Sequence, residues 1–231
     1  AFLIPSIAAL FFQLFVNNYR WMLLLRAQGI AAGVRQTLPL SLIGLFFNYA
    51  MPGGVGGDLV KGFYIMQENP TRRTAAATTV LIDRLVGLFG LVVTSLVAIV
   101  LNWAVVSQNP KLVSIAIGVT ALFFCFTVFF GLALSRRIYS HPWIKAALHA
   151  LPAQKSVMKI YDSIHVFRHR PQEFAWAVLL TAPSSLLTLA FFYWIGQAIG
   201  GEEVAFAVYA FAAPLGLIVS ALPISPAGVG V

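Results

Sequence analysis

The stretch Asn48-Tyr49-Ala50-Met51-Pro52-Gly53-Gly54-Val55-Gly56-Gly57-Asp58-Leu59-Val60-Lys61 interrupts an otherwise apolar part of the sequence. Leu38–Phe47 precedes it and Leu59–Met66 follows it, and both segments are apolar. Proline lacks the backbone N–H that a helix needs and glycine is entropically unfavourable there, so Pro52 and the four glycines are expected to stop a helix. Broken backbone at membrane depth survives only where protein or a water-filled cavity shelters it. The stretch is therefore the first place to look for function.

The composition is that of an integral membrane protein. Of 231 residues, 60% are hydrophobic and 10% are charged, and the mean hydropathy is +0.87, whereas a globular protein has about a quarter of its residues charged. The net charge of +8 is spread between apolar runs, which argues against a nucleic-acid partner and for basic residues that set membrane topology. The single cysteine, Cys125, excludes a disulfide framework within the chain and a cysteine-based metal site.

The apolar segments predict an all-α, polytopic membrane protein that forms a single transmembrane domain over residues 1–231. A helix needs about 20 apolar residues to cross about 30 Å of hydrocarbon. Arg20, Trp21 and Arg26 follow the first segment as an aromatic and cationic interface signature. The predicted spans are Ala1–Tyr19, Ala75–Trp103, Leu112–Leu134 and Glu173–Gly200, with a further apolar run at Val204–Leu222.

The segment around the interruption is too short to cross a membrane twice. Thr37–Met51 would be about 22 Å long as a helix, which favours a re-entrant hairpin over residues 36–66 with Leu59–Met66 as its returning half. A hairpin of this kind places the basic groups of Arg20–Arg35, Lys61–Arg73 and Arg136–Arg170 on one face, which the positive-inside rule makes cytoplasmic. Residues 135–170 alternate basic and apolar side chains, as interfacial amphipathic helices do. Lys111, Glu202 and Glu203 fall on the opposite face.

A second interrupted segment resembles the first. Pro226-Ala227-Gly228-Val229-Gly230 aligns with Pro52-Gly53-Gly54-Val55-Gly56, and three predicted spans, an odd number, separate the two. Residues 204–231 would therefore begin a second broken-helix repeat of inverted orientation, the arrangement that marks a binding site in transporters. The alternative is a chance match in a glycine-rich chain. Because Ala1 is not a methionine and Val231 lies inside this motif, we expect the chain to be a fragment.

Four motifs in this order resemble the flippase-like family, also called the lysylphosphatidylglycerol synthase transmembrane family. They are R-W-M-L-L-L-R-A-Q-G-I at Arg20–Ile30, F-F-N-Y-A-M-P-G-G-V-G-G-D-L-V-K at Phe46–Lys61, L-I-D-R-L-V-G-L at Leu81–Leu88 and L-P-I-S-P-A-G-V-G at Leu222–Gly230. The resemblance implies a polytopic inner-membrane protein. Relatives include the lipid-translocating half of the multiple peptide resistance factor, hopanoid-associated membrane proteins and membrane modules beside glycosyltransferases. The family usually has an acidic residue soon after the second glycine motif, and this chain ends before it.

The first glycine motif does not have the spacing of a phosphate-binding nucleotide loop. Instead, backbone N–H groups after Gly57 and the positive end of the returning half-helix could hold a lipid phosphate, with Lys61 one turn further on. Asp58 has two other interpretations: it caps the same helix, or it meets a cationic headgroup.

Asp83 and Arg84 lie within a predicted span, about 12 Å from its start. An unpaired charge at membrane depth costs about 2.5–3.5 kcal/mol on insertion scales. Adjacent helix residues do not face each other, so each needs a partner elsewhere, and Lys61, Asp58 and Asn48 are the candidates. The competing interpretation is a buried pair that only fixes helix packing.

His165, His169 and Asp162 have a helical spacing that could hold a metal ion, but in a basic interfacial segment they are expected to face lipid headgroups. We expect no metal, no cofactor and, since no Ser/His/Asp set or paired carboxylates occur, no enzymatic activity of the isolated chain. The candidate substrate-binding residues are Asn48, Pro52, Gly53, Gly54, Gly56, Gly57, Asp58, Lys61, Asp83, Arg84, Ser225, Pro226, Gly228 and Gly230.

The favoured hypothesis is a flippase-like transporter that translocates or binds an amphipathic lipid. Intramembrane charge and interrupted helices support it, and the expected ligand is an anionic phospholipid or a polyprenyl-phosphate lipid. The alternative is a membrane module of, or a scaffold for, a lipid-modifying enzyme such as an aminoacyl-lipid synthase or a glycosyltransferase. Either hypothesis leaves room for a homo-oligomer or a partner enzyme.

Overall fold

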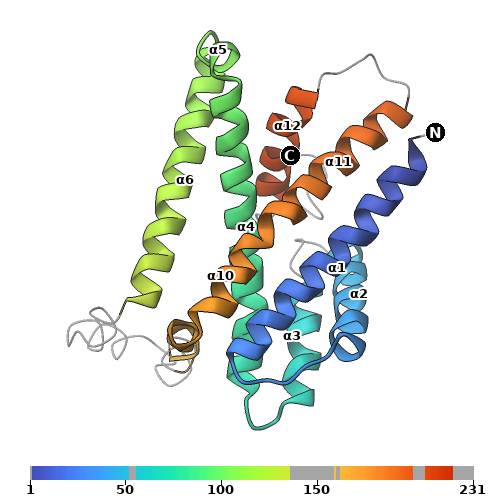
Figure 1. The fold of residues 1–231 in the computed structure, drawn as a ribbon, viewed down its shortest axis with the longest axis vertical. Coiled ribbons are helices and arrows are strands. Elements are labelled where there is room, and N and C mark those ends of the chain that lie inside the picture. The colour runs from blue at the N-terminus through green and yellow to red at the C-terminus, as the bar shows by residue number, and fades with distance from the viewer. Residues whose placement is uncertain (1, 52–55, 136–158, 160–161, 200–205, 221–231) are drawn as a thin grey trace.

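The computed structural model describes residues 2–51, 56–135, 159, 162–199 and 206–220, and every regular element in these ranges is a helix (Figure 1). The predicted all-α class is therefore confirmed for this part of the chain. Several predictions fall outside the described residues. They concern Pro52, Gly53, Gly54, Ser225, Pro226, Gly228 and Gly230, most of the basic segment 135–170, and the second glycine motif of the proposed inverted repeat, which stays a prediction.

Among the described residues, three helical stretches are long and apolar enough to cross a membrane. They are α4 (Arg73–Leu101), α6 (Pro110–Leu134) and Pro171–Ala198, with mean hydropathies of 2.3, 2.4 and 1.7. Each corresponds to a span predicted from the sequence, with ends shifted by about two residues. Between α4 and α6 lies the predicted turn, which contains the single-turn helix α5 (Trp103–Val106).

The sequence predicted the third stretch as one continuous span, but in the structure it is interrupted. It consists of α10 (Pro171–Leu179) and α11 (Thr181–Ala198), which meet at Leu180. Pro183 explains the interruption, because a proline cannot donate a hydrogen bond to the carbonyl four residues earlier and its ring clashes with that carbonyl. Three polar residues in the first turns of α11, Thr181, Ser184 and Ser185, are buried.

The first helix, α1 (Leu3–Ala27), is longer than the predicted span, which ended at Tyr19. Its 25 residues give a length of about 37 Å, enough to cross a membrane. It is nevertheless not among the stretches that qualify by hydropathy, because Gln13, Asn17, Asn18 and Arg20 make its middle part polar. These side chains prove to line the interior of the bundle.

Helices α2 (Val34–Ala50) and α3 (Gly56–Glu68) pack against each other as a hairpin. Their 17 and 13 residues give lengths of about 26 and 20 Å, both shorter than the hydrocarbon core of a bilayer. Figure 1 shows the start of α2 and the end of α3 at the same end of the molecule, with the tip of the hairpin near the middle. This geometry is the one expected of a re-entrant hairpin, and its position in a membrane stays a prediction.

The glycines at the tip do more than stop a helix. Gly56 and Gly57 lie in the first turn of α3, so the prediction that all four glycines break the helix was wrong for these two. A Cβ atom on Gly57 would lie 1.8 Å from the carbonyl oxygen of Gly44 in α2. The two backbones can approach this closely only because both positions lack a side chain.

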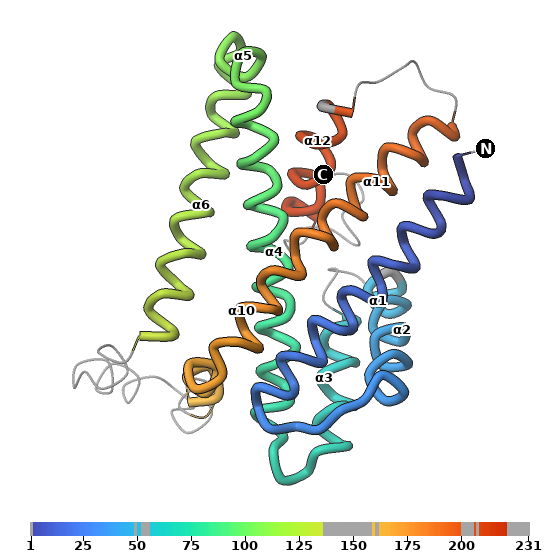
Figure 2. Tube along the Cα trace, viewed as in Figure 1, coloured from blue at the N-terminus to red at the C-terminus, as the bar shows by residue number. Residues whose placement is uncertain are grey.

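Helix α4 is the central element of the bundle (Figures 1 and 2). It contacts α1, α3, α6 and α11 as well as the short α12 (Phe206–Ser220), while α1 packs along α10 and α11. The end of α1, the start of α2, the α3–α4 connection and the start of α10 all lie at one end of the molecule. The basic residues Arg26, Arg35, Arg72, Arg73 and Arg170 belong to these element ends.

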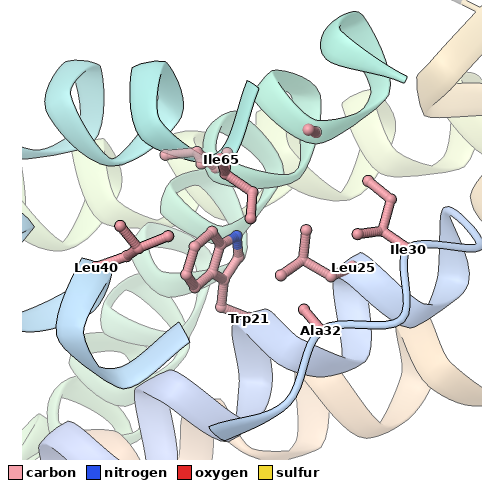
Figure 3. Close-up of a cluster of buried hydrophobic side chains, with 8 residues drawn as sticks. Trp21, Leu25, Ile30, Ala32, Leu40 and Ile65 are labelled. Atoms are coloured by element: carbon pink, nitrogen blue, oxygen red, sulfur yellow. The ribbon is translucent and has the colours of Figure 1, made fainter. Parts of the chain in front are cut away.

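A cluster of buried apolar side chains fills the space between α1, α2, α3 and α4 at that end (Figure 3). Trp21 lies at its centre and is fully buried. The interpretation of Trp21 as part of an interface signature was therefore wrong, because this side chain faces other helices and not the membrane surface. The other members are Leu25, Ile30, Ala32, Leu40, Ile65, Ala76 and Val80.

Large apolar side chains cover much of the outside of the bundle. On α6, Ile117 is 66% exposed and Phe124 is 61% exposed, and similar residues occur along α1 and α4. Soluble proteins rarely expose apolar surface on this scale, whereas lipid tails solvate it well. The exterior is therefore that of a membrane protein, and any polar groups inside it need polar partners.

Candidate functional site

Asp83 and Arg84 of α4 both bind α3, although they are adjacent and point in different directions. The Nη1 atom of Arg84 lies 2.5 Å from Oδ2 of Asp58, and Nζ of Lys61 lies 3.7 Å from Oδ2 of Asp83. The prediction that each residue finds a partner elsewhere in the bundle is confirmed. The candidate partners Asp58 and Lys61 are the ones that the structure brings together with them.

Arg20 of α1 is a third member of this charged cluster. Its Nε donates to Oδ1 of Asp83 at 2.8 Å, and its Nη2 donates to the backbone carbonyl of Asp83 at 3.3 Å. The sequence pattern predicts that Arg20 lies at the membrane interface, and this prediction was wrong, since only 6% of the residue is exposed. Gly87, one turn beyond Asp83, makes room for it: a Cβ atom there would lie 3.2 Å from Nη2 of Arg20.

Lys61 is stabilised in the interior by two groups. Besides Asp83, the indole ring of Trp21 lies with its centroid 3.7 Å from Nζ, a cation–π contact. The indole N–H of Trp21 donates to Oγ1 of Thr79 at 3.1 Å, which holds the ring in place. A buried tryptophan and a buried lysine therefore satisfy each other and lie just behind the ion pairs.

The tip of the hairpin is held by Asn48, whose Oδ1 accepts a hydrogen bond from the backbone N–H of Gly57 at 2.9 Å. This amide oxygen satisfies one of the backbone donors in the first turn of α3, directly before the N–H groups that the sequence offered to a phosphate or to Asp58. Asp58 itself lies in the first turn of α3, where its carboxylate pairs with Arg84. Both residues therefore face the interior of the bundle from the tip.

Next to this cluster lies a cavity of about 460 Å³, lined by residues of α1, α2, α3, α4, α11 and α12. Three of the sequence-predicted residues line it, namely Asn48, Asp58 and Arg84, while Lys61 and Asp83 lie behind its wall. The remaining lining residues are Gln13, Asn17, Arg20, Gly87, Leu88, Leu91, Thr181, Ser184, Ser185, Thr188, Leu217 and Ser220. A smaller cavity of about 130 Å³ between α1, α2 and α3 shares Asn17, Asn48 and Asp58 with it and is also lined by Lys61.

Two polar stripes, one on α1 and one on α11, were not predicted from the sequence, and they form adjoining parts of the wall. Ser184 on α11 donates through Oγ to Oδ1 of Asn17 at 2.7 Å, and Gln13 donates through Nε2 to Oγ1 of Thr188 at 2.6 Å. A signal for these stripes was present. Polar residues at positions 13, 17 and 20, and again at 181, 184, 185 and 188, recur on one face of a helix within apolar segments.

The charges around the cavity favour an anion. The cluster contains three cations, Arg20, Lys61 and Arg84, against the carboxylates of Asp58 and Asp83. The cavity lining itself contains two guanidinium groups, of Arg20 and Arg84, and one carboxylate, of Asp58, beside neutral hydroxyl and amide groups. Guanidinium groups bind phosphate and carboxylate oxygens through charge-assisted hydrogen bonds. Within the part of the chain that is described, no three His, Cys, Asp or Glu side chains are grouped to hold a metal ion.

The sequence as a whole can now be placed. A model of the family described as the lysylphosphatidylglycerol synthase transmembrane region matches residues 1–231, the full length of the chain. The chain belongs to this family. Membership confirms the resemblance drawn from the four motifs and indicates a lipid-related function in a membrane. Neither a curated protein nor a solved structure gives a significant match.

Proposed function

We propose that this protein binds and translocates an amphipathic lipid whose phosphate-bearing headgroup enters the cavity between α1, α3, α4 and α11. One observation carries the proposal: a polar cavity of about 460 Å³, with two arginines in its wall, lies inside a bundle whose exterior is apolar. A purely structural bundle in lipid gains nothing from such a cavity, because buried polar and charged groups are costly there.

The lining supports a phosphate group in particular. Arg20 and Arg84 supply guanidinium N–H donors, while Ser184, Ser185 and Thr188 supply hydroxyl groups that can donate or accept. We therefore favour an anionic phospholipid or a polyprenyl-phosphate lipid as the ligand. The proposal assigns the chain binding and transport and no catalytic step.

The hairpin supports movement of the headgroup as well as binding. Because α2 and α3 are about 26 and 20 Å long, their tip ends part of the way along the long helices, and Asn48 and Asp58 stand at that tip. Interrupted helices of this kind form the binding sites of many secondary transporters near the bilayer midplane. We place the basic end of the bundle on the cytoplasmic side.

Reconstitution into vesicles tests the proposal. Vesicles of phosphatidylcholine would carry a small fraction of phosphatidylglycerol with a fluorophore on one acyl chain, and an impermeant quencher would report the label in the outer leaflet over time. We expect the protein to accelerate exchange of the labelled phosphatidylglycerol between leaflets over protein-free vesicles, and to act less on labelled phosphatidylethanolamine, which has no net charge.

The Arg84→Gln variant should reduce this rate about tenfold or more, because a charge-assisted hydrogen bond contributes about 1.5–3 kcal/mol. Arg26→Gln is the matched control, since Arg26 lies exposed in the last turn of α1, away from the cavity. Specific lipid binding without exchange between leaflets would favour the alternative, a membrane module or scaffold for a lipid-modifying enzyme. The proposal would be refuted if no anionic lipid were either bound or exchanged between the leaflets.

A further inference from the structure

A second, apolar groove runs between α3 and α4, with a volume of about 220 Å³. Leu59 is 66% exposed and Leu81 is 46% exposed on its two sides, so it lies next to the lipid-facing exterior of the bundle. Only the ion pair between Asp58 and Arg84 makes one part of its lining charged. The complete lining is Asp58, Leu59, Gly62, Met66, Ala77, Val80, Leu81 and Arg84.

The groove and the polar cavity share one part of their walls. Asp58 and Arg84 line both spaces, so their ion pair stands between a polar compartment inside and an apolar one on the flank. A ligand that is polar at one end and apolar at the other could place its polar end in the cavity and its apolar end in the groove. Detergents apart, membrane lipids are the molecules with that chemistry in the surroundings of the protein.

The Asp58–Arg84 ion pair is the more accessible of the two arginine pairs in the cluster. The side chains of Arg84 and Asp58 are 21% and 28% exposed, against 8% and 13% for Arg20 and Asp83. An ion pair that water can still reach is easier to separate than a buried one, since its charges are less dependent on each other. Phosphate oxygens can also take the place of the Asp58 carboxylate on the Arg84 guanidinium.

We propose that the α3–α4 groove holds a hydrocarbon chain of the transported lipid, and that the Asp58–Arg84 ion pair is the gate between this chain and the headgroup in the cavity. In the closed state of the gate, the Asp58 carboxylate is paired with the Arg84 guanidinium. When an anionic headgroup enters, its phosphate binds Arg84 and Asp58 is released towards the cavity. The inference rests on the proposed function and adds to it the path of the chain and the residue that the headgroup displaces.

Small residues keep the groove open. Gly62 is buried on α3, yet a Cβ atom built on it meets no atom within 4 Å, so a larger side chain there would extend into free space. Ala77 lines the groove from α4. A larger side chain at either position would occupy the space where the hydrocarbon chain has to lie, so an intact lipid could no longer bind with its headgroup in the cavity.

Phenylalanine at either position is therefore a selective test. We expect Gly62→Phe and Ala77→Phe to weaken binding of phosphatidylglycerol at least tenfold, while binding of glycerophosphoglycerol, its water-soluble deacylated form, stays within twofold of the wild type. Gly118→Phe is the matched control, because Gly118 on α6 also has free space around it but lies outside the groove. The Asp58→Asn variant should bind glycerophosphoglycerol several-fold more tightly, because the competing charge is gone.

Photolabelling locates the chain directly. Phosphatidylglycerol with a diazirine on one acyl chain should label Leu59, Met66 and Leu81 in preference to Ile117 and Phe124 of α6, and unlabelled phosphatidylglycerol should compete. If the phenylalanine variants lose both ligands, this label decides whether the defect lies in the groove or in the cavity. Label spread evenly over the exterior, or intact lipid bound normally by both phenylalanine variants, would overturn the groove while the proposed function stands. A wild-type protein that binds neither ligand would refute the proposed function itself.

Discussion

At the scale of single residues, the packing of three helices depends on one carboxylate, that of Asp83, which pairs with two cations. Asp83 accepts from Arg20 at 2.8 Å and lies 3.7 Å from Lys61, and all three side chains are at most 13% exposed. Two helices, α1 and α3, are thereby tied to α4 through one side chain. The neighbouring Arg84 is different, because its pair with Asp58 borders the cavity. We therefore assign packing to Asp83 and ligand contact to Arg84.

Replacing Asp83 with asparagine should destabilise the fold. The change leaves Arg20 and Lys61 as buried cations without their shared carboxylate, and breaking a buried pair costs about 3–5 kcal/mol. We expect the free energy of unfolding to fall by about 3 kcal/mol, measured by titration of SDS into mixed micelles with tryptophan fluorescence as the readout. Glu173→Gln is the control: its partner Arg170 is 62% exposed, so the loss should stay below about 1 kcal/mol. Equal stability of the Asp83→Asn variant and the wild type would contradict this role.

At the scale of elements, the hairpin of α2 and α3 exists because two glycines let two backbones meet. Gly57 and Gly44 face each other backbone to backbone across the hairpin, and Gly56 lies against the side chain of Met51. Close backbone contact brings Asn48 within 2.9 Å of the N–H of Gly57, which completes the tip. The position of Asp58 at the cavity is a consequence of this contact.

An alanine at position 57 should therefore disrupt the hairpin. Its Cβ would lie 1.8 Å from a backbone oxygen of α2, and backbone cannot move aside as a flexible side chain can. We expect Gly57→Ala to lower the free energy of unfolding by about 3 kcal/mol or more, measured by the same titration. The matched control on the same helix is Gly62→Ala, where free space and the better helix propensity of alanine predict a gain of up to about 1 kcal/mol. The hairpin packing would be contradicted if both variants behaved alike.

At the scale of the whole molecule, charge and polarity are sorted along and across the bundle. The ends of α1 and α2 that carry Arg26 and Arg35 lie together with the start of α4 at one end, while α5 and the start of α6 with Lys111 lie at the other (Figure 1). Polar side chains gather inside, around the cavity, and apolar ones gather outside. A bundle arranged in this way crosses a membrane in one preferred orientation.

Cysteine labelling tests that orientation. In a background with Cys125 replaced by serine, Ser107→Cys lies between α5 and α6, and Ser135→Cys lies at the end of α6. We expect an impermeant thiol reagent to label position 107 in intact cells, and position 135 only after the membrane is permeabilised. Labelling of position 135 but not of position 107 in intact cells would reverse the proposed topology.

Local properties of the sequence were sufficient to predict the class of fold and much of its layout. Hydropathy and length identify α4, α6 and the stretch that α10 and α11 form, and the same length argument shows that α2 and α3 are too short to cross. The need of Asp83 and Arg84 for partners also follows from local facts, because a charge in an apolar helix is costly wherever that helix packs. These are statements about single segments, and they require no knowledge of neighbours.

Only the tertiary structure decided which polar residues form the cavity. The sequence around Arg20 and Trp21 fits a membrane surface and a bundle interior equally well. Only the packing of α4, which supplies Asp83 and Thr79 as hydrogen-bond partners, shows that both side chains lie in the interior. Asn17 meets Ser184 across 167 positions of sequence, so neither residue reveals its partner locally. A polar side chain on an apolar helix can face lipid headgroups, water or another helix, and the choice depends on which distant helix offers a hydrogen bond. The helical membrane fold therefore follows from properties of single segments, whereas the site depends on contacts between segments that are distant in the sequence.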